Sequence, residues 1–161
     1  MTLASGASAA VWHHDDETGA RPSAGDIDQV RISAGEKVVT MRVEFNGRVP
    51  YQTDVFFDVD RSRKGPEFVA SYNDDGGGTD QLFIDRAHGF SSPLDGARCK
   101  PRSVRLSDGG ETLTARFRVG CLTFRGEKPD RLRVNVTTND DFVTLDSAPA
   151  RKRFGRWFAV G

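Results

Sequence analysis

Two aspartates close a strand-like segment in the first half of the chain, and a glutamate follows after a turn. The segment reads FFDVDRSRKGPE, and its carboxylates are Asp58, Asp60 and Glu67. In an extended strand Asp58 and Asp60 leave the same face about 7 Å apart, and the Gly65-Pro66 turn allows Glu67 to return toward them. Calcium takes roughly six to eight oxygen ligands, which carboxylates and loop carbonyls supply. The sequence therefore predicts a calcium site here, with solvated turn residues as the alternative interpretation.

A second acidic loop follows shortly after this segment. It reads NDDGGGTD, and its candidate oxygen ligands are Asn73, Asp74, Asp75 and Asp80. Neither loop has the ligand spacing of an EF-hand, and Asp and Gly are also the ordinary residues of tight turns. The loop is therefore interpreted either as a second calcium shell or as a solvated turn.

The other polar residues lack the partners that catalysis requires. A glycosidase needs two carboxylates, one of them with a raised pKa in an apolar pocket, and every acidic residue here lies in a polar run. His88 precedes Ser91 and Ser92 in DRAHGFSSP, but no nucleophile motif surrounds them. The WHHDDE segment, with His13 and His14, is either a transition-metal site or a solvated terminus. We therefore expect a protein that is not an enzyme.

Three aromatic residues lie at strand positions that alternate with the main apolar residues, so they face the other side of the sheet. They are Phe56, Phe83 and Trp157, and the period of two in a strand places their rings on an outer sheet face. Exposed rings flanked by arginine and aspartate are typical of sugar-stacking or partner-binding surfaces. We expect these three residues to bind the ligand, with Arg42 and Asp54 as polar neighbours. The alternative is that loops or the N-terminal segment cover that face.

The elements that would position these residues are short strands. Apolar and polar residues alternate from residue 26 onward, as in KVVTMRVEF, YQTDVFFDVD, LTARFRV and RLRVNVT, and turn residues separate the segments. No amphipathic helical pattern is present. Eight or nine such strands pack most economically as two sheets. The sequence therefore predicts an all-β, antiparallel two-sheet β-sandwich, jelly-roll-like, over residues 26–161, preceded by a flexible arm over residues 1–25.

The two cysteines flank a predicted hairpin. If Leu106 faces Leu113 across the SDGGE turn, Cys99 and Cys121 fall within one residue of direct opposition. A bulge would align them, and the disulfide would stabilise the fold by about 3 kcal/mol. Disulfides belong to secreted proteins, and Ala7-Ser8-Ala9 has the form of a signal-cleavage site. We expect a disulfide in a secreted or extracellular protein. The alternatives are two buried thiols and an ordinary small-residue terminus.

Charge and hydropathy restrict the partners. The 161 residues include 23 basic and 23 acidic side chains, so no net field attracts nucleic acid or anionic lipid. No segment approaches the roughly 20 apolar residues of a membrane-spanning helix. Asn135-Val136-Thr137 is a formal glycosylation sequon inside a predicted strand. We expect no nucleic-acid partner and no membrane span.

The order of these segments resembles a group of secreted domains. DIDQVRI, VVTMRVEF, DVFFDVD and GPEF, then the cysteine pair and the closing RFGRWFAVG, look like the secreted β-sandwich domains common in high-GC actinobacteria. Those domains look related to the family-nine carbohydrate-binding modules and to DOMON-type sandwiches. The resemblance covers residues 26–161 and implies an exported sandwich, sometimes calcium-bearing, without a catalytic residue. We therefore expect an exported module that binds a glycan or a cell-surface component, with calcium as a structural ion. The alternative is a structural or protein-interaction domain.

Overall fold

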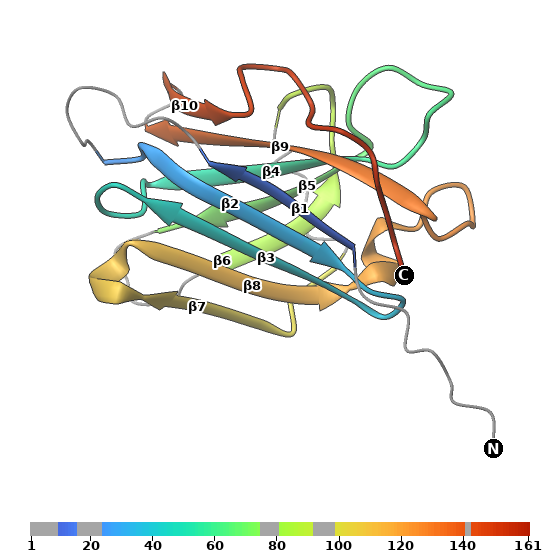
Figure 1. Ribbon diagram of the computed structural model, residues 1–161, viewed down its shortest axis with the longest axis horizontal. Coiled ribbons are helices and arrows are strands. Elements are labelled where there is room, and N and C mark those ends of the chain that lie inside the picture. Colours follow the sequence, from blue (N-terminus) through green and yellow to red (C-terminus); the bar gives the residue numbers. More distant parts are fainter. Residues whose placement is uncertain (1–9, 16–23, 75–80, 92–98, 141–142) are drawn as a thin grey trace.

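The structure is a computed structural model that describes residues 10–15, 24–74, 81–91, 99–140 and 143–161. These residues form eleven strands and two short 3-10 helices, labelled in Figure 1. No helix among them is long and apolar enough to cross a membrane. The elements are β1 (Ala10–Asp15), β2 (Ile27–Ala34), β3 (Val38–Phe45), β4 (Gln52–Asp58), β5 (Phe68–Asn73), β6 (Gln81–Arg86), β7 (Ser103–Ser107), η1 (Asp108–Gly110), β8 (Thr112–Arg118), η2 (Val119–Leu122), β9 (Arg131–Asp140), β10 (Val143–Ala148) and β11 (Phe158–Ala159).

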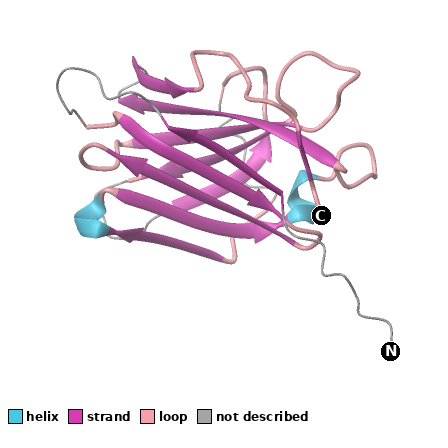
Figure 2. Ribbon diagram, viewed as in Figure 1, coloured by secondary structure: helices cyan, strands magenta, loops and turns pink. Residues whose placement is uncertain are grey.

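The strands form two antiparallel sheets that face each other (Figures 1 and 2). The five-stranded sheet has the order β1-β2-β3-β8-β7, and the six-stranded sheet has the order β10-β9-β4-β5-β6, with β11 also paired to β9. The predicted two-sheet β-sandwich is therefore confirmed. The nine predicted strands correspond to β2–β9 and β11. The two additional strands, β1 and β10, lie at sheet edges, and neither shows a run of alternating apolar residues.

Alternation of apolar and polar residues builds the core between the sheets. On β3, Val39, Met41 and Val43 are fully buried, whereas Arg42 between them is exposed. On β4, Val55 and Phe57 enter the same apolar cluster. Phe57 meets Phe117 of the opposite sheet edge-to-face at 5.7 Å between ring centroids. The inward positions of both sheets thus form one continuous core.

Residues 10–15 do not belong to a flexible arm. They form β1 and pair with β2, with Trp12 directly opposite Ile32. The Trp12 side chain is only 3% exposed. It packs against the backbone of Gly155 so closely that a Cβ atom there would lie 2.3 Å from Trp12 Nε1. The expectation of an arm over 1–25 is corrected at these six residues, because burying the indole ring and pairing the β2 edge both favour docking.

The predicted disulfide between Cys99 and Cys121 is present. Leu106 does face Leu113 in the β7–β8 hairpin, but Cys99 lies outside that ladder. It exchanges two backbone hydrogen bonds of 3.1 Å with Ile84 of β6, in the other sheet. Cys121 lies in η2, directly after β8. The disulfide therefore connects the two sheets and does not close a bulged hairpin, because the chain crosses between sheets before β7.

Candidate functional site

Buried polar and aromatic side chains gather on the outer face of the six-stranded sheet. Asp54, Phe56 and Asp58 leave β4 on the side opposite to the core residues Val55 and Phe57. Although they point away from the core, their exposed fractions are only 3%, 2% and 0%. Loops must therefore cover this face of the sheet.

A series of aromatic rings in contact with one another and with one guanidinium lies on this face. We define the ring ladder as Phe56, Phe90, Phe154, Arg133 and Trp157. Phe56 meets Phe90 at 5.3 Å, and Phe90 meets Phe154 at 5.2 Å between ring centroids. The Arg133 guanidinium lies 4.8 Å from the ring centroids of both Phe154 and Trp157. Phe90 and Phe154 come from loops, so these loops are held against the sheet by aromatic and cation–π contacts.

Asn135 fixes the loop that carries Phe154. This asparagine lies on the outer face of β9 and has no exposed surface. Its Nδ2 atom donates to the carbonyl oxygens of Ala148, Ala150 and Arg153, at 3.2, 2.9 and 2.7 Å. The side-chain amide of the sequon asparagine is therefore engaged in structural hydrogen bonds in the folded protein. A polar residue in mid-strand anchors the covering loop to the sheet.

A pocket opens beside the ring ladder. It has a volume of about 190 Å³, smaller than the roughly 300–1,000 Å³ of a pocket for a drug-sized ligand. Two rings, two hydroxyl groups, one amide, one carboxylate and two cations surround it among the described residues. The lining residues are Asp54, Phe56, Phe90, Thr137, Asn139, Thr144, Arg151 and Lys152.

Asp54 is the buried anion of this pocket, and its neighbours on three strands hold it. Ser71 Oγ of β5 donates to Asp54 Oδ1 at 2.6 Å, and Asn139 Nδ2 of β9 donates to Oδ2 at 3.2 Å. Gln52 Nε2, two residues earlier on β4, lies 3.1 and 2.9 Å from the two oxygens. Burial raises the pKa of Asp54, and the hydrogen bonds from Ser71 and Gln52 oppose that shift. The carboxylate is thus fixed in position with its charge poorly solvated.

This arrangement suits binding rather than the two-carboxylate chemistry of a glycosidase. Asp54 is the single carboxylate among the described lining residues. The next outward carboxylate on the strand, Asp58, lies four residues further and hence about 13 Å along β4. Glycosidase pairs stand roughly 5–9.5 Å apart. The pocket can instead accept a small polar ligand that contacts ring faces, hydroxyl groups and cations.

The predicted calcium ligands are brought together only in part. Asp58 Oδ2 accepts from Arg133 Nε at 2.9 Å and from Nη2 at 2.6 Å, across the β4–β9 register. Glu67 Oε2 accepts from the backbone N–H of Val59 at 2.9 Å. Burial raises the pKa of Glu67, and the nearby charge of Asp58 adds to this effect. Burial also raises the pKa of Asp58, although Arg133 opposes the shift. Asp58 and Glu67 are therefore neighbours in a poorly solvated position.

Asp60 is positioned differently. Its Oδ1 atom accepts from both the backbone N–H and the hydroxyl group of Ser62, at 2.9 and 2.6 Å. These hydrogen bonds lower the pKa of Asp60. Among the described residues no three His, Cys, Asp or Glu side chains form a group that could hold a metal. Within the described part of the chain the buried Asp58 Oδ1 atom has no well-formed hydrogen-bond partner, although contacts with the Asp60 backbone and the Glu67 side chain help to oppose the raised pKa of Asp58. The calcium site stays a prediction, with Asp58 and Glu67 as its nearest pair of ligands.

The three predicted ligand-binding rings do not form a flat exposed platform. Phe56 is covered by Phe90, and Trp157 is half-buried with the guanidinium of Arg61 5.3 Å from its ring centroid. Phe83 is half-buried on β6, paired with Ser71, and does not line the pocket. Arg42 lies on β3 of the other sheet, so its expected position beside Asp54 is wrong. Covering loops thus replace the expected surface by a small pocket.

Other candidates from the sequence fall elsewhere. His88 and Ser91 are exposed in the segment after β6. Asn73 is the last residue of β5, and Asp74 follows it. His13 contacts Asp15 at 3.2 Å, and His14 stacks on Trp12 with 5.9 Å between ring centroids. The remaining candidates lie outside the described residues, namely Ala7, Ser8, Ala9, Asp16, Glu17, Asp75, Asp80 and Ser92.

Several residues of the site were missed in the sequence. Phe90 and Phe154 lie in loops, where no periodicity assigns a ring to a face. Asn139 and Arg151 belong to no sequence motif that indicates a binding site. A signal did exist at Asn135, since a polar residue inside an alternating strand must find partners when both faces of its sheet are covered.

Comparison with protein-family models, with curated proteins and with solved structures gives no match to this chain.

Proposed function

We propose that the protein is an exported, non-catalytic binding module that holds a glycan at the pocket beside the ring ladder. The observation that carries this proposal is the convergence of two aromatic residues, hydroxyl and amide groups and a fixed carboxylate around one small cavity. A sugar presents an apolar face of C–H groups together with hydroxyl groups around its edge. Ring faces and oriented polar groups are the matching protein surface.

The size and composition of the pocket favour one sugar unit of a longer chain. A volume of about 190 Å³ is too small for an extended oligosaccharide, whose remaining units would lie outside. The half-buried ring of Phe90 offers a stacking surface, and Thr144 and Asn139 offer hydroxyl and amide groups. The exposed cations of Arg151 and Lys152 can donate hydrogen bonds to ring or hydroxyl oxygens.

Two further parts of the proposal rest on other features. Export is supported by the Cys99–Cys121 disulfide, because such bonds persist in oxidising compartments. A structural calcium ion at Asp58 and Glu67 is supported by the buried Asp58 Oδ1 atom, which lacks a well-formed hydrogen-bond partner in the described structure. Both carboxylates would supply hard oxygen ligands.

Affinity electrophoresis tests the binding function. Native gels containing xylan, galactomannan, barley β-glucan or glycol chitin should retard the protein in at least one case. Thr144→Phe places a ring at the pocket without removing a recorded hydrogen bond, and it should abolish retardation. Val143→Phe is the matched control, because residue 143 on the same strand is 63% exposed and lies outside the pocket lining. Equal retardation of the wild type and Thr144→Phe would contradict the proposal.

A protein-interaction role is the second candidate, and the edge strand β10 favours it. Val143 and Leu145 on this strand are 63% and 43% exposed, and β10 has one neighbour in its sheet, β9. Among the described residues no strand pairs with the other edge of β10, although the start of β2 contacts this strand through the Ile27 N–H and Asp146. An edge strand with exposed apolar side chains is a template for adding a strand from a partner. Co-purification of a partner that Leu145→Lys abolishes and Thr144→Phe does not would favour this role over glycan binding.

A further inference from the structure

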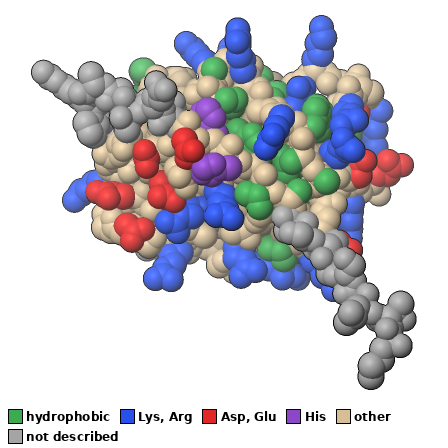
Figure 3. All heavy atoms as spheres, viewed as in Figure 1, with side chains coloured by type: hydrophobic (Ala, Val, Ile, Leu, Met, Phe, Trp, Pro, Cys, Tyr) green, Lys and Arg blue, Asp and Glu red, His purple; other side chains and the backbone are tan. Residues whose placement is uncertain are grey.

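The outer face of the five-stranded sheet has a chemistry unlike that of the pocket. Its strands β1, β2, β3, β8 and β7 lie toward the viewer in Figures 1 and 3. In Figure 3 acidic side chains gather at the left end of this face, and Lys and Arg side chains lie beside and below the histidines. The molecule has no net charge, so this separation of charge is a local feature of the sheet.

The strand register aligns arginines in a row across the sheet. His13 pairs with Arg31, Arg31 pairs with Arg42, Arg42 pairs with Thr114, and Thr114 pairs with Arg105. Neighbouring strands lie about 4.8 Å apart, so the row from β2 to β7 spans about 14 Å. Arg116 and Arg118 continue the positive charge along β8. We define the arginine face as Arg31, Arg42, Arg105, Arg116 and Arg118.

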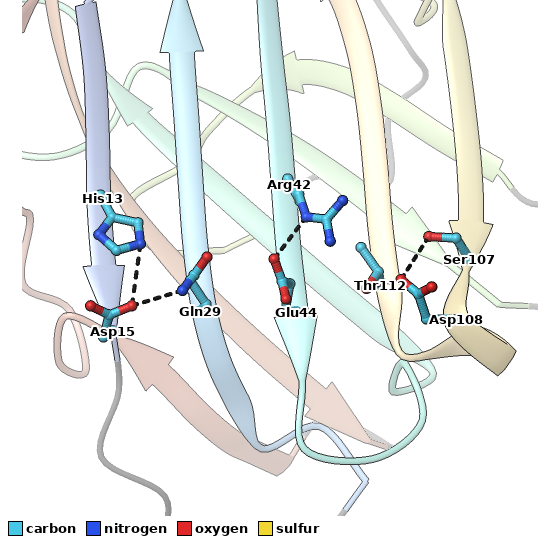
Figure 4. Close-up of polar contacts among 8 residues, drawn as sticks. All are labelled: His13, Asp15, Gln29, Arg42, Glu44, Ser107, Asp108 and Thr112. Atoms are coloured by element: carbon cyan, nitrogen blue, oxygen red, sulfur yellow. Dashed lines mark hydrogen bonds and ion pairs between the residues drawn. The ribbon is translucent and has the colours of Figure 1, made fainter.

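The charges of the arginine face are almost unpaired. All five side chains are exposed, and in the described part of the chain one of them, Arg42, has an ion pair. Arg42 Nε lies 2.7 Å from Glu44 Oε1, and Figure 4 shows the terminal nitrogens of the guanidinium directed away from that carboxylate. Arg31 directly faces Arg42, and like charges in opposed positions destabilise a sheet. The arginine face is therefore maintained against a local electrostatic penalty.

The acidic side chains lie in the next row toward one end of the strands. Asp15, Gln29, Glu44, Thr112 and Ser107 are aligned there by the same register. Figure 4 shows their contacts, with Gln29 donating to Asp15 and Asp108 close to Thr112 and Ser107. Asp15 and Asp108 contact local polar groups, and Glu44 pairs with Arg42. The other four arginines have no ion pair among the described residues and are available to an external anion.

We propose that the arginine face binds an acidic polysaccharide, through its carboxylate or sulfate groups. An extended acidic glycan presents anions at regular intervals and hydroxyl groups between them. The face matches that pattern with guanidinium groups, which recognise carboxylates and sulfates by paired hydrogen bonds, and with intervening hydroxyl side chains. These hydroxyl residues are Ser33, Thr40, Ser103 and Thr114.

Other polyanions fit this face less well. The outward positions of its five described strands contain no Phe, Tyr or Trp, so single-stranded nucleic acid would lack the stacking platform that such binding uses. A membrane surface is favoured by large apolar side chains that enter the headgroup region, whereas the outward apolar residues of these described strands are two small ones, Val11, 38% exposed, and the half-buried Val38. A hydroxyl-rich, cationic surface selects the acidic glycan.

Binding to immobilised probes tests the proposal. Polygalacturonate and dextran sulfate serve as acidic polymers, and dextran serves as the neutral control. The triple variant Arg31→Gln/Arg105→Gln/Arg116→Gln should weaken binding to an acidic polymer by about tenfold or more, because three exposed guanidinium contacts are lost. The matched control Lys64→Gln/Lys128→Gln/Arg156→Gln removes three exposed charges away from this face and should bind as the wild type does.

Several results would contradict the proposal that the arginine face binds an acidic polysaccharide. Absence of binding to both acidic polymers, or equal weakening in the two triple variants, would overturn the proposal. Equally tight binding to oligo(dT) or to phosphatidylserine vesicles would assign the face to another class of polyanion. Thermal unfolding should show no loss of stability in the arginine triple variant, since Arg31→Gln relieves the repulsion with Arg42. Thr144→Phe should leave binding to the acidic polymer intact, so failure here is distinct from failure of the pocket.

Discussion

At the scale of single residues, the buried carboxylate of Asp54 shows how the fold builds a polar pocket floor. A buried charge is costly unless donors surround it. Ser71, Gln52 and Asn139 supply those donors from three adjacent strands. Because the strands fix their positions, the carboxylate is oriented before any ligand arrives. Preorganisation of this kind lowers the entropy that binding must overcome.

Replacing Asp54 by Asn tests the raised pKa. A carboxyl group whose pKa is higher in the folded than in the unfolded state stabilises the fold below its unfolded pKa. That contribution is lost as pH rises through the folded pKa. Burial raises the pKa of Asp54. The free energy of unfolding of Asp54→Asn, relative to that of the wild type, should therefore be higher at pH 7 than at pH 3.5. Urea unfolding at both values measures the difference. A lower relative free energy of unfolding at pH 7 than at pH 3.5 would contradict the raised pKa of Asp54.

The two tryptophans should respond differently to truncation. Trp12 is 3% exposed in the core cluster, so Trp12→Ala should lower the free energy of unfolding by about 3 to 5 kcal/mol. Trp157 is half-buried against Arg61 and Arg133, so Trp157→Ala should lower it by about 1 to 2 kcal/mol. Urea unfolding of both variants measures the difference, with the exposed neighbour Val11→Ala as control. A larger loss for Trp157→Ala would refute the placement of the rings.

Chelation tests the proposed calcium at Asp58 and Glu67. Removing an ion that binds only the folded state lowers the free energy of unfolding, by about 3 kcal/mol when its free concentration is 100 times Kd. EDTA should therefore lower the Tm, and added calcium should restore it. Glu67→Gln keeps an acceptor for the Val59 N–H but loses a charged ligand, so its Tm should not respond to calcium. An unchanged wild-type Tm in EDTA would contradict the calcium site.

The sequence predicts which face of a strand a side chain occupies, because this depends only on the alternation of residues along the strand. The outward positions of Asp54, Phe56 and Asp58 follow from the period of β4, because Val55 and Phe57 had to enter the core. Their burial matches the alternative interpretation, that loops cover this face, but the sequence did not identify the covering residues, Phe90 and the loop that Asn135 anchors. A loop has no period from which its position over a sheet can be derived.

At the scale of elements, the disulfide joins parts of the two sheets that hydrogen bonds do not connect. Cys99 is paired to β6 and Cys121 follows β8. The variant Cys99→Ala/Cys121→Ala should lose about 3 kcal/mol of unfolding free energy, as expected for opening a loop with a separation of 22 residues. Reductant should destabilise the wild type and leave the variant unaffected. Two alkylatable thiols in the folded, unreduced protein would refute the bond.

The strands that sequence patterns revealed are those with one buried face. β3 and β8 alternate cleanly because one side meets the core and the other meets solvent. β1 and β10 were missed because edge strands carry few core residues: Trp12 is the one fully buried side chain of β1, and β10 exposes Val143 and Leu145. Their existence follows from the neighbours they pair with, which local patterns do not report.

At the scale of the whole molecule, the sandwich presents two outer faces with different chemistry. The six-stranded sheet carries a covered face with a small, partly aromatic pocket. The five-stranded sheet carries exposed arginines aligned across its strands. The core between the sheets is continuous and rigid, so the two surfaces are held at fixed positions. On the proposals above, one face would hold a sugar unit and the other would contact an anionic chain.

NMR titration of the 15N-labelled protein tests whether the pocket binds a sugar. Cello-, xylo-, manno- and chito-oligosaccharides are added in turn, and the side-chain amides of Asn139 and Gln52 report on the pocket floor. The account predicts saturable shifts of these amides and of the Thr137 and Thr144 backbone with at least one sugar. These shifts should be absent in Thr144→Phe and retained in Val143→Phe. No pocket shift with any of the four sugars, or unchanged shifts in Thr144→Phe, would contradict it.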